Sequence, residues 1–425
     1  MTCIGPARQF SCCTPCLHGA GISGELRRYQ MKPDENIRDV VMISPYPRQG
    51  KRSFYGSGVV TYAQKLAWAL ADHYSVSVIA DKLPGLPAKY QEEGVTVYRA
   101  FKPGPLYPIR VFRALRRVKA DVVHIQHSYF LYGGFLEGIL FPFLVLLCRS
   151  RSRVVVTMHD LPSLEQLDDG DFQRQNLLPK HGFLLKTGIR AITKAIGTFA
   201  SIIVVHEAFM RDVAVHDYGL NERKVVVVPH GVDRAPPHDR GSSRESLGIH
   251  DGRRLILFFG YLIGYKGIET LISAFRDRLN DGRYSLIIAG GDHPRAREDP
   301  SYRRWLNGII KEVNDLRARG ADIRLTGFVE DPSVYFSAAD MVVLPYVERF
   351  AASGPAAAAA SYGLPLFITD HGSSGDVEAD IIHFIEEWKG HSRDEFVPYW
   401  DIIAKGYYSF MRPSAHGDNQ AEDRI

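Results

Sequence analysis

The sequence predicts an α/β protein made of two doubly wound, Rossmann-like units that face each other across a cleft. Short runs rich in Val, Ile and Leu alternate with longer segments throughout the chain, which is typical of parallel strands joined by crossover helices. The alternation is interrupted once, at residues 235–252, which are rich in Pro, Gly, Ser and charge. With 425 residues the chain is also long enough for two domains. Two units joined by one linker imply a cleft between them.

The first unit is expected over residues 37–234. Its first strand is predicted at residues 40–45, and a helix with one apolar face follows at residues 59–70. Gly56 and Gly58 lie in the turn between them, where backbone N–H groups could approach a phosphate, although the turn falls short of a full GxGxxG motif. Further strands are expected at residues 76–80, 95–99, 122–126, 154–158, 202–205 and 225–228.

The most apolar segment of the chain is residues 131–148. Glycines, Glu137 and Pro142 interrupt it, and its longest clean run is too short to span a bilayer. We interpret it as a buried crossover helix, and a membrane-facing apolar surface is the alternative.

The second unit is expected over residues 253–375, with strands at residues 255–259, 285–289, 323–326, 341–344 and 366–368. A polar loop after the fourth of these strands leads to Ser353, Gly354 and an alanine-rich helix that ends before Gly363. The free N–H groups at the start of this helix would suit a phosphate, because they face the sheet edge where α/β folds bind ligands. An ordinary crossover helix is the alternative.

Composition and charge narrow the function classes. The chain is 45% hydrophobic and 24% charged, which is ordinary for a soluble globular protein, and its net charge of +4 gives no argument for nucleic acid. Basic residues cluster at residues 110–119 and 149–153, where anionic lipid or substrate could bind, but a solvated helix face would give the same pattern. The scarcity of cysteines after residue 16 indicates a reducing compartment. We therefore expect a cytoplasmic protein. Peripheral binding to the inner face of the membrane is a further hypothesis.

The two ends of the chain are expected to differ from the middle. Residues 1–36 lack periodicity and are predicted to form a disordered extension, without the apolar region of a signal peptide. Their cysteines do not have the spacing of a zinc site. Residues 376–425 are predicted to form helices and a tail that pack back across the two units, and packing against a membrane is the alternative.

Four motifs, in this order, resemble the retaining GT-B glycosyltransferases of family 4. They are VVPHGVD at residues 227–233, GYLIGYKGIETLISAF at 260–275, LTGFVED at 325–331 and SGPAAAAASYGLP at 353–365. The resemblance implies an acceptor domain followed by a nucleotide-sugar donor domain. It also implies transfer of a sugar to a glycan, lipid-linked or small-molecule acceptor with retention of configuration. Neither a metal nor another cofactor is expected.

The resemblance assigns roles at the diphosphate. Lys266 would supply a positive charge to it, and Ser353 and Gly354 would donate backbone N–H groups. Gly56 and Gly58 would lie beside the diphosphate, and Gly260 also falls in the donor motif. A solvated lysine at the start of a helix is the alternative for Lys266.

The resemblance also assigns roles at the base and the sugar. Phe328 and Val329 would contact the nucleobase, and core packing is the alternative for Phe328. His159, at a strand end, would contact the donor sugar or the acceptor, although a histidine at a strand end can also be purely structural.

The chain departs from the family pattern at two places. Many relatives carry an arginine in the loop before Lys266, and this chain has Tyr-Leu-Ile there, so one positive charge is missing or supplied elsewhere. The usual Glu-x7-Glu pair would fall at Phe350 and Ala358, which leaves Glu348 as a carboxylate out of register. A subset of the family with Ser-Gly before the alanine helix shares this pattern. A degenerate GT-B protein that binds nucleotide or a partner without catalysis, and a sugar-nucleotide epimerase, are the other hypotheses.

Overall fold

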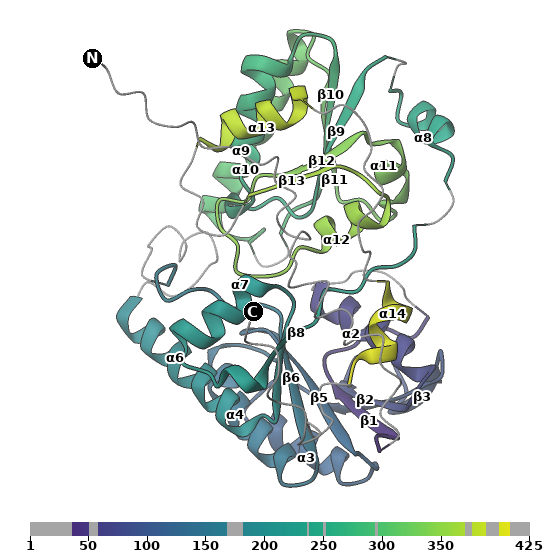
Figure 1. Cartoon of the computed structure of the whole chain (residues 1–425), viewed down its shortest axis with the longest axis vertical. Helices are drawn as coiled ribbons and strands as arrows, with labels where there is room; N and C mark the ends of the chain where they lie inside the picture. Colours follow the sequence, from purple (N-terminus) through teal and green to yellow (C-terminus); the bar gives the residue numbers. More distant parts are fainter. Residues whose placement is uncertain are drawn as a thin grey trace, which may run out of the picture.

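The chain forms two α/β units, each built on its own sheet, which lie one above the other in Figure 1. This is a computed structural model. It describes residues 36–50, 58–167, 182–235, 238–249, 252–293, 296–369, 376–387 and 399–408. The predicted fold class, two doubly wound units, is confirmed.

The first sheet has eight strands in the order β3-β4-β2-β1-β5-β6-β7-β8. The strands are β1 (Asp39–Ile43), β2 (Ser75–Asp81), β3 (Lys89–Glu92), β4 (Val95–Phe101), β5 (Val122–His127), β6 (Arg153–Met158), β7 (Ile202–Val205) and β8 (Val225–Val227). Neighbouring strands pair in parallel except β3 with β4, which are antiparallel. Sequence analysis missed β3, because its four residues are mostly polar and lie at the sheet edge.

Helices cover this sheet, and α4 has an unexpected exposed face. The helices are α2 (Gly58–Ala71), α3 (Tyr107–Leu115), α4 (Phe135–Arg149), α6 (Gly182–Phe199) and α7 (Ala208–Asp212), with short turns η1 (Val213–Asp217) and η2 (Glu222–Lys224). Because α4 packs between α3 and α6, only part of its circumference meets the core, and the prediction of a buried helix is wrong for its outer face. Among the described residues, no helix is both long and apolar enough to cross a membrane.

The second sheet has five parallel strands in the order β11-β10-β9-β12-β13. They are β9 (Arg254–Phe259), β10 (Tyr284–Ala289), β11 (Ile323–Gly327), β12 (Met341–Leu344) and β13 (Leu366–Ile368). The helical elements are α8 (Arg240–Ser246), η3 (Gly264–Lys266), α9 (Ile268–Ala274), η4 (Phe275–Leu279), α10 (Pro300–Ala318), α11 (Ser333–Ala338), α12 (Gly354–Ser361) and α13 (Val377–Glu387).

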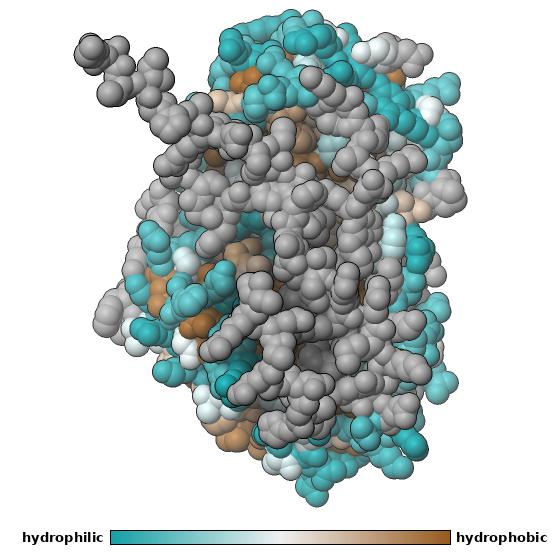
Figure 2. Space-filling model, in the orientation of Figure 1, coloured by the Kyte–Doolittle hydropathy of each residue, from teal (hydrophilic) through white to brown (hydrophobic). Residues whose placement is uncertain are grey.

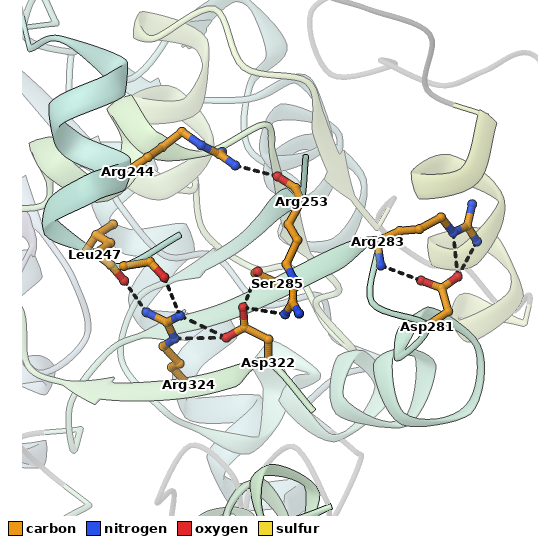
Figure 3. Close-up of polar contacts among 9 residues, drawn as sticks. Arg244, Leu247, Arg253, Asp281, Arg283, Ser285, Asp322 and Arg324 are labelled. Atoms are coloured by element: carbon orange, nitrogen blue, oxygen red, sulfur yellow. Dashed lines mark hydrogen bonds and ion pairs between the residues drawn. The ribbon is translucent and has the colours of Figure 1, made fainter. Parts of the chain in front are cut away.

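Charged side chains tie the amino ends of the second sheet together (Figure 3). Asp322 accepts hydrogen bonds from Ser285 and, at 3.1 Å each, from Arg253 and Arg324. Burial alone would raise the pKa of Asp322, but the Ser285 hydroxyl and the two guanidinium groups outweigh it and lower that pKa. Arg324 also donates to the carbonyl of Leu247, just after α8. The charges at this edge therefore have structural partners, and the carboxyl edge is left for a ligand.

The predicted linker contains a helix, α8. Arg240 and Arg244 of this helix form ion pairs with Asp340, which also accepts a hydrogen bond from the backbone N–H of Leu255 at 2.7 Å. Sequence analysis predicted a linker over residues 235–252 but no helix within it. Periodicity could not reveal α8, because charges rather than an apolar face attach it to the second unit.

The chain returns to the first unit at α14 (Trp400–Gly406), which packs against α2 (Figure 1). The N–H of Trp400 donates to the carbonyl of Val232 at 3.1 Å, which pairs the outgoing and returning segments. Trp400, Ile403 and Tyr407 are buried in the core of the first unit. The tail was expected to pack across both units, and residues 399–408 pack into the core of the first unit.

Replacing Gly231 with alanine tests this return. A Cβ at position 231 would lie 2.3 Å from the Trp400 ring. We expect Gly231→Ala to lower the free energy of unfolding by about 1–3 kcal/mol through overpacking. Gly308→Ala is the matched control, because a Cβ at this position in α10 meets nothing within 4 Å. The control should be neutral or stabilising by up to about 1 kcal/mol. Urea unfolding measures both, and equal stability of the two variants would contradict the packing.

Candidate functional site

Glycines line the carboxyl ends of three strands in the second unit. Gly260 follows β9 with a φ of +137°, a backbone conformation that favours glycine. A Cβ on Gly290 would lie 1.8 Å from the carbonyl oxygen of Gly260, and a Cβ on Gly291 would lie 2.8 Å from the Cβ of Phe328. The loops after β9, β10 and β11 therefore approach each other backbone to backbone. Sequence analysis singled out Gly260 but missed the Gly-Gly pair, although two glycines directly after a strand were a usable signal.

Lys266 lies beside the glycine-lined strand ends. It ends η3, and Gly267 follows with a φ of +66° at a place where a Cβ would lie 1.8 Å from the carbonyl oxygen of Pro345. This close approach sets Lys266 against the loop after β12. Its Nζ donates to the Tyr346 hydroxyl at 3.1 Å, and it lies 3.2 Å from the position that a Cβ on Gly260 would take.

A row of hydrogen bonds joins Lys266 to the start of α12. The Tyr346 and Ser353 hydroxyl oxygens are 2.9 Å apart, and Ser353 caps α12 by accepting from the N–H of Ala356 at 3.2 Å. Because the ammonium can only donate, the Tyr346 oxygen accepts from it, and in the bond between Tyr346 and Ser353 either hydroxyl can donate. That bond uses one of the two hydroxyl protons, which leaves the other for donation to a further acceptor. A cation, a hydroxyl and a helix N-terminus thus form an anion-binding arrangement.

Lys266 stays charged in this setting. Burial alone would lower the pKa of Lys266, but the neighbouring Tyr346 and Tyr265 phenols and the hydrogen bond to Tyr346 outweigh it, so that the pKa is raised. Sequence analysis missed Tyr346, although a tyrosine two residues after a buried strand was visible. Gly354 is the first residue of α12, which is the position that the phosphate prediction requires.

The loop after β12 reaches across to the first unit. The N–H of Leu161 donates to the carbonyl of Phe350 at 2.7 Å, and Asp160 forms an antiparallel bridge with Ala351. Residues 350–351 therefore lie against the carboxyl end of β6, directly after His159. Glu348 is half-buried in the same loop, between Tyr346 and the contacts to the first unit.

An ion pair strengthens this connection. Arg349 is only 4% exposed, and its guanidinium pairs with the Glu207 carboxylate after β7 and lies 5.1 Å from the Phe209 ring. Burial raises the pKa of Glu207, although Arg349 and the backbone N–H of Ser353 oppose the rise. Glu207 therefore contacts the cap residue of α12 from the other unit. Sequence analysis identified neither residue, because 142 positions separate them.

His159 lies in a hydrogen-bonded row of its own. Its Nε2 is 2.8 Å from the Gln126 side-chain amide, and its Nδ1 is 3.3 Å from Nε2 of His206. His206 donates from Nδ1 to the carbonyl of Val228 at 2.9 Å. Burial lowers the pKa of both histidines, so each carries one N–H. His159 must therefore donate from Nδ1 and accept at Nε2, and we assign the Gln126 amide with its nitrogen toward the ring.

Further histidines and aromatic rings surround His159. The Tyr62 ring of α2 lies 4.6 Å from the His159 ring and 5.0 Å from the His230 ring. Burial lowers the pKa of His124, His127 and His206 to about 3 and the pKa of His230 to about 4. Neutral imidazoles therefore lie at or just after the ends of β5, β6, β7 and β8 at the carboxyl edge of the first sheet, and His124 lies further back within β5.

The structure thus gathers Gly260, Lys266, Ser353 and Gly354 at one place, and the loop that holds them is joined to the segment after His159. Phe328 and Val329, which were predicted to contact the nucleobase, lie at the neighbouring end of β11. There the Phe328 side chain is 57% exposed, so the core-packing alternative for it is wrong.

The remaining predicted residues lie at the edges of this arrangement. Val329 is partly buried and packs against the core of the second unit. Gly58 begins α2, and Gly56 lies outside the described residues.

Comparison with known proteins identifies the class of this arrangement. The model "Glycosyltransferase Family 4" matches residues 56–235, and "Glycosyl transferases group 1" matches residues 253–383. Sucrose-phosphate synthase from Thermosynechococcus elongatus superposes with a TM-score of 0.61 at 17% identity, over 88% of this chain and 94% of that chain. HepE of Anabaena, in complex with UDP-glucose, superposes with a TM-score of 0.57 at 15% identity, over 88% and 95%. The fold is that of the GT-B glycosyltransferases.

Curated relatives agree with this class. The D-inositol 3-phosphate glycosyltransferase of Corynebacterium glutamicum is 30% identical over 191 residues, which is 40% of this chain and 44% of the relative. The protein of that name from Kineococcus radiotolerans is 28% identical over 180 residues, which is 37% and 39%. The matched part of the chain thus covers less than half the length of these relatives. With both family models, the chain belongs to the family 4-like glycosyltransferases of the GT-B fold.

The neutral histidines predict a loss of stability in acid. Because an unfolded histidine has a pKa near 6.5 and the buried ones titrate near 3, the unfolded chain binds more protons as the pH falls below about 6.5. Each such histidine should cost up to about 1.4 kcal/mol of unfolding free energy per pH unit below that value. Urea unfolding at a series of pH values from 8 down to about 5 measures the slope.

The variant His127→Phe tests how much His127 contributes to this pH dependence of the unfolding free energy. His127 lies among the rings of Tyr129 and Phe141, so phenylalanine fits the surroundings, and we expect a smaller slope below the unfolded pKa. His73→Phe, at an exposed position, is the control and should leave the slope unchanged. An unchanged slope in His127→Phe would contradict the assignment of a neutral buried ring.

Proposed function

We propose that the protein transfers a sugar from a nucleotide-sugar donor to an acceptor hydroxyl, with the donor diphosphate bound between Lys266 and Ser353. The row Lys266–Tyr346–Ser353 at the start of α12 carries this proposal. It supplies a positive charge, a hydroxyl proton and backbone N–H groups, which a departing nucleoside diphosphate requires. The GT-B fold supports the proposal, because HepE shares that fold and holds UDP-glucose.

Bond cleavage between the anomeric carbon and the phosphate oxygen transfers an electron pair to the diphosphate. Lys266 already carries its proton, so it can stabilise the growing negative charge without any proton movement. The Ser353 hydroxyl and the N–H of Gly354 would add hydrogen bonds to the same oxygens. The acceptor oxygen forms the new bond to the anomeric carbon, and its proton passes to the departing phosphate.

We propose retention of configuration, with attack on the face that the diphosphate leaves. This course needs no enzymic nucleophile, which agrees with the position of Glu348 outside the register of the family pair. Glu348 is then a candidate for contact with the sugar rather than for covalent catalysis. The acceptor is proposed only as a class: a glycan, lipid-linked or small-molecule compound with a free hydroxyl.

His159 is proposed to lie at the sugar side of the cleft. Both of its ring nitrogens already have partners in Gln126 and His206, so it can contact a sugar only by exchanging one of these bonds. A fixed tautomer makes this ring a defined donor at Nδ1 and a defined acceptor at Nε2. It would serve to orient a hydroxyl group rather than to remove a proton, because its pKa lies well below the usual value.

Replacing Lys266 tests the diphosphate site. We expect Lys266→Met to weaken nucleotide binding by roughly 10- to 100-fold, which is the usual worth of a charged hydrogen bond. Calorimetry with UDP, GDP and ADP measures binding, and a panel of the corresponding nucleotide sugars measures transfer. Lys311→Met, on the exposed side of α10, is the control and should bind as the parent does. If the parent protein binds none of these nucleotides, the proposed function is wrong. If Lys266→Met binds them as tightly as the parent does, the diphosphate does not bind at Lys266.

Chelation tests the proposal that no metal is needed. Lys266 and the start of α12 would stabilise the negative charge of the leaving diphosphate. We therefore expect the rate of sugar transfer to be the same with and without EDTA. Loss of transfer in EDTA, with recovery on adding Mg²⁺ or Mn²⁺, would contradict this part of the proposal.

A further inference from the structure

Exposed apolar side chains gather on one face of the first unit. In the described residues ten large hydrophobic side chains are exposed, and seven of them belong to residues 106–146. The seven are Leu106, Ile109, Phe135, Leu136, Ile139, Phe143 and Leu146. Figure 2 shows hydrophobic surface on the lower left of the molecule, where Figure 1 draws the outer helices of this unit. A soluble surface seldom concentrates its apolar side chains in this way.

The spacing of these side chains makes a stripe along α4, called here the apolar stripe and composed of Leu136, Ile139, Phe143 and Leu146. Successive members are three or four residues apart, so they share one face of the helix. The opposite face, which includes Leu144, is in the core of the first unit. The helix α4 is therefore apolar on both sides, and the core needs only one of them.

Helix α3 lies alongside α4 in the same direction, and cations gather where the two helices end. The Tyr107 hydroxyl donates to the carbonyl of Glu137 at 3.1 Å, which joins the first turns of the two helices. At the other end a shallow pocket lies between the segments that follow them. Its lining includes four cationic side chains, Arg116, Arg117, Lys119 and Arg151, and no acidic one.

The whole segment is strongly basic. Residues 106–153 contain eight Arg and Lys residues and two acidic ones, Asp121 and Glu137. Asp121 accepts hydrogen bonds from the N–H groups of Arg38 and Asp39, and Glu137 accepts one from the N–H of Gly134. Both acids are therefore engaged with the backbone, while Arg110 and Arg113 are exposed on α3, the helix that packs against α4.

We propose that this face docks on an anionic lipid bilayer, with the apolar stripe in the interfacial region and the cationic pocket at lipid phosphate groups. The apolar stripe along α4 and the cationic pocket beyond the end of the same helix together match a bilayer surface, which offers apolar depth and negative charge. A second copy of this chain fits less well, because its matching face is equally basic and would bring no complementary negative charge to the cationic pocket. Nucleic acid would satisfy the cations but leave the apolar stripe exposed.

The direction of α4 relates this docking to the cleft. The helix follows β5, so its first turn lies at the carboxyl edge of the first sheet, the edge that holds His159. A bilayer along the apolar stripe would therefore extend to the acceptor side of the cleft. Docking itself does not depend on the proposed function. Only the idea that docking supplies a lipid-linked acceptor rests on the proposed glycosyl transfer.

Vesicle flotation with the full-length protein tests the docking. We expect the protein to float with vesicles of phosphatidylcholine and phosphatidylglycerol, to stay behind with phosphatidylcholine alone, and to be released by high salt. Leu136→Ser with Phe143→Ser, and separately Arg116→Glu with Arg117→Glu, should each lower the bound fraction roughly tenfold or more. Ile310→Ser and the pair Arg317→Glu with Arg319→Glu, exposed positions of the second unit, are the matched controls and should float like the parent.

Separate measurements keep this test apart from the proposed function. Circular dichroism and nucleotide binding check that each variant folds and keeps its second unit intact. Absence of flotation by the parent, or flotation that neither double variant lowers, would overturn the docking proposal. Sedimentation that shows a dimer of the parent, lost in the apolar-stripe variant, would overturn it in favour of a second copy as the occupant.

Discussion

The close contact between Gly267 and the carbonyl of Pro345 sets the geometry of the candidate site. No side chain fits between them, since a Cβ on Gly267 would lie 1.8 Å from the Pro345 oxygen. Two loops from different crossovers are therefore packed backbone to backbone, and this packing brings the Lys266 ammonium within 3.1 Å of the Tyr346 hydroxyl. The same contact also helps to set the position of the Ser353 hydroxyl that caps α12, because this hydroxyl is hydrogen-bonded to Tyr346.

The same loop holds the two units together. One end is fixed against Lys266, and the other contacts Leu161 and Glu207 of the first unit. The position of the cation and the closure of the cleft are therefore linked through eight residues of chain, 346–353. The row from Lys266 to Ser353 lies within the second unit, and the contacts of the same loop with the first unit add to its support, which suits a site preorganised for an anion.

Local sequence patterns predicted the strands of both sheets and some residues of the candidate site. They failed for contacts between residues that are far apart in the sequence. The strands before Gly260 and Ser353 were visible as β-branched runs, and glycine and serine at their ends have local structural reasons. The ion pair of Glu207 with Arg349 has no such signal, because it depends on the packing of one unit against the other. The helix α4 shows a further limit: when both faces are apolar, periodicity cannot tell which of them meets the core.

The burial of α14 in the first unit has a consequence for how the protein is made. Trp400, Ile403 and Tyr407 belong to the same core as Tyr62, while the second sheet and its helices lie between them in the chain. A chain that emerges from the ribosome in order exposes all of the second unit before the last piece of the first unit arrives. The second unit can therefore fold while the first is still incomplete, and the core that forms first along the sequence is the one that closes last.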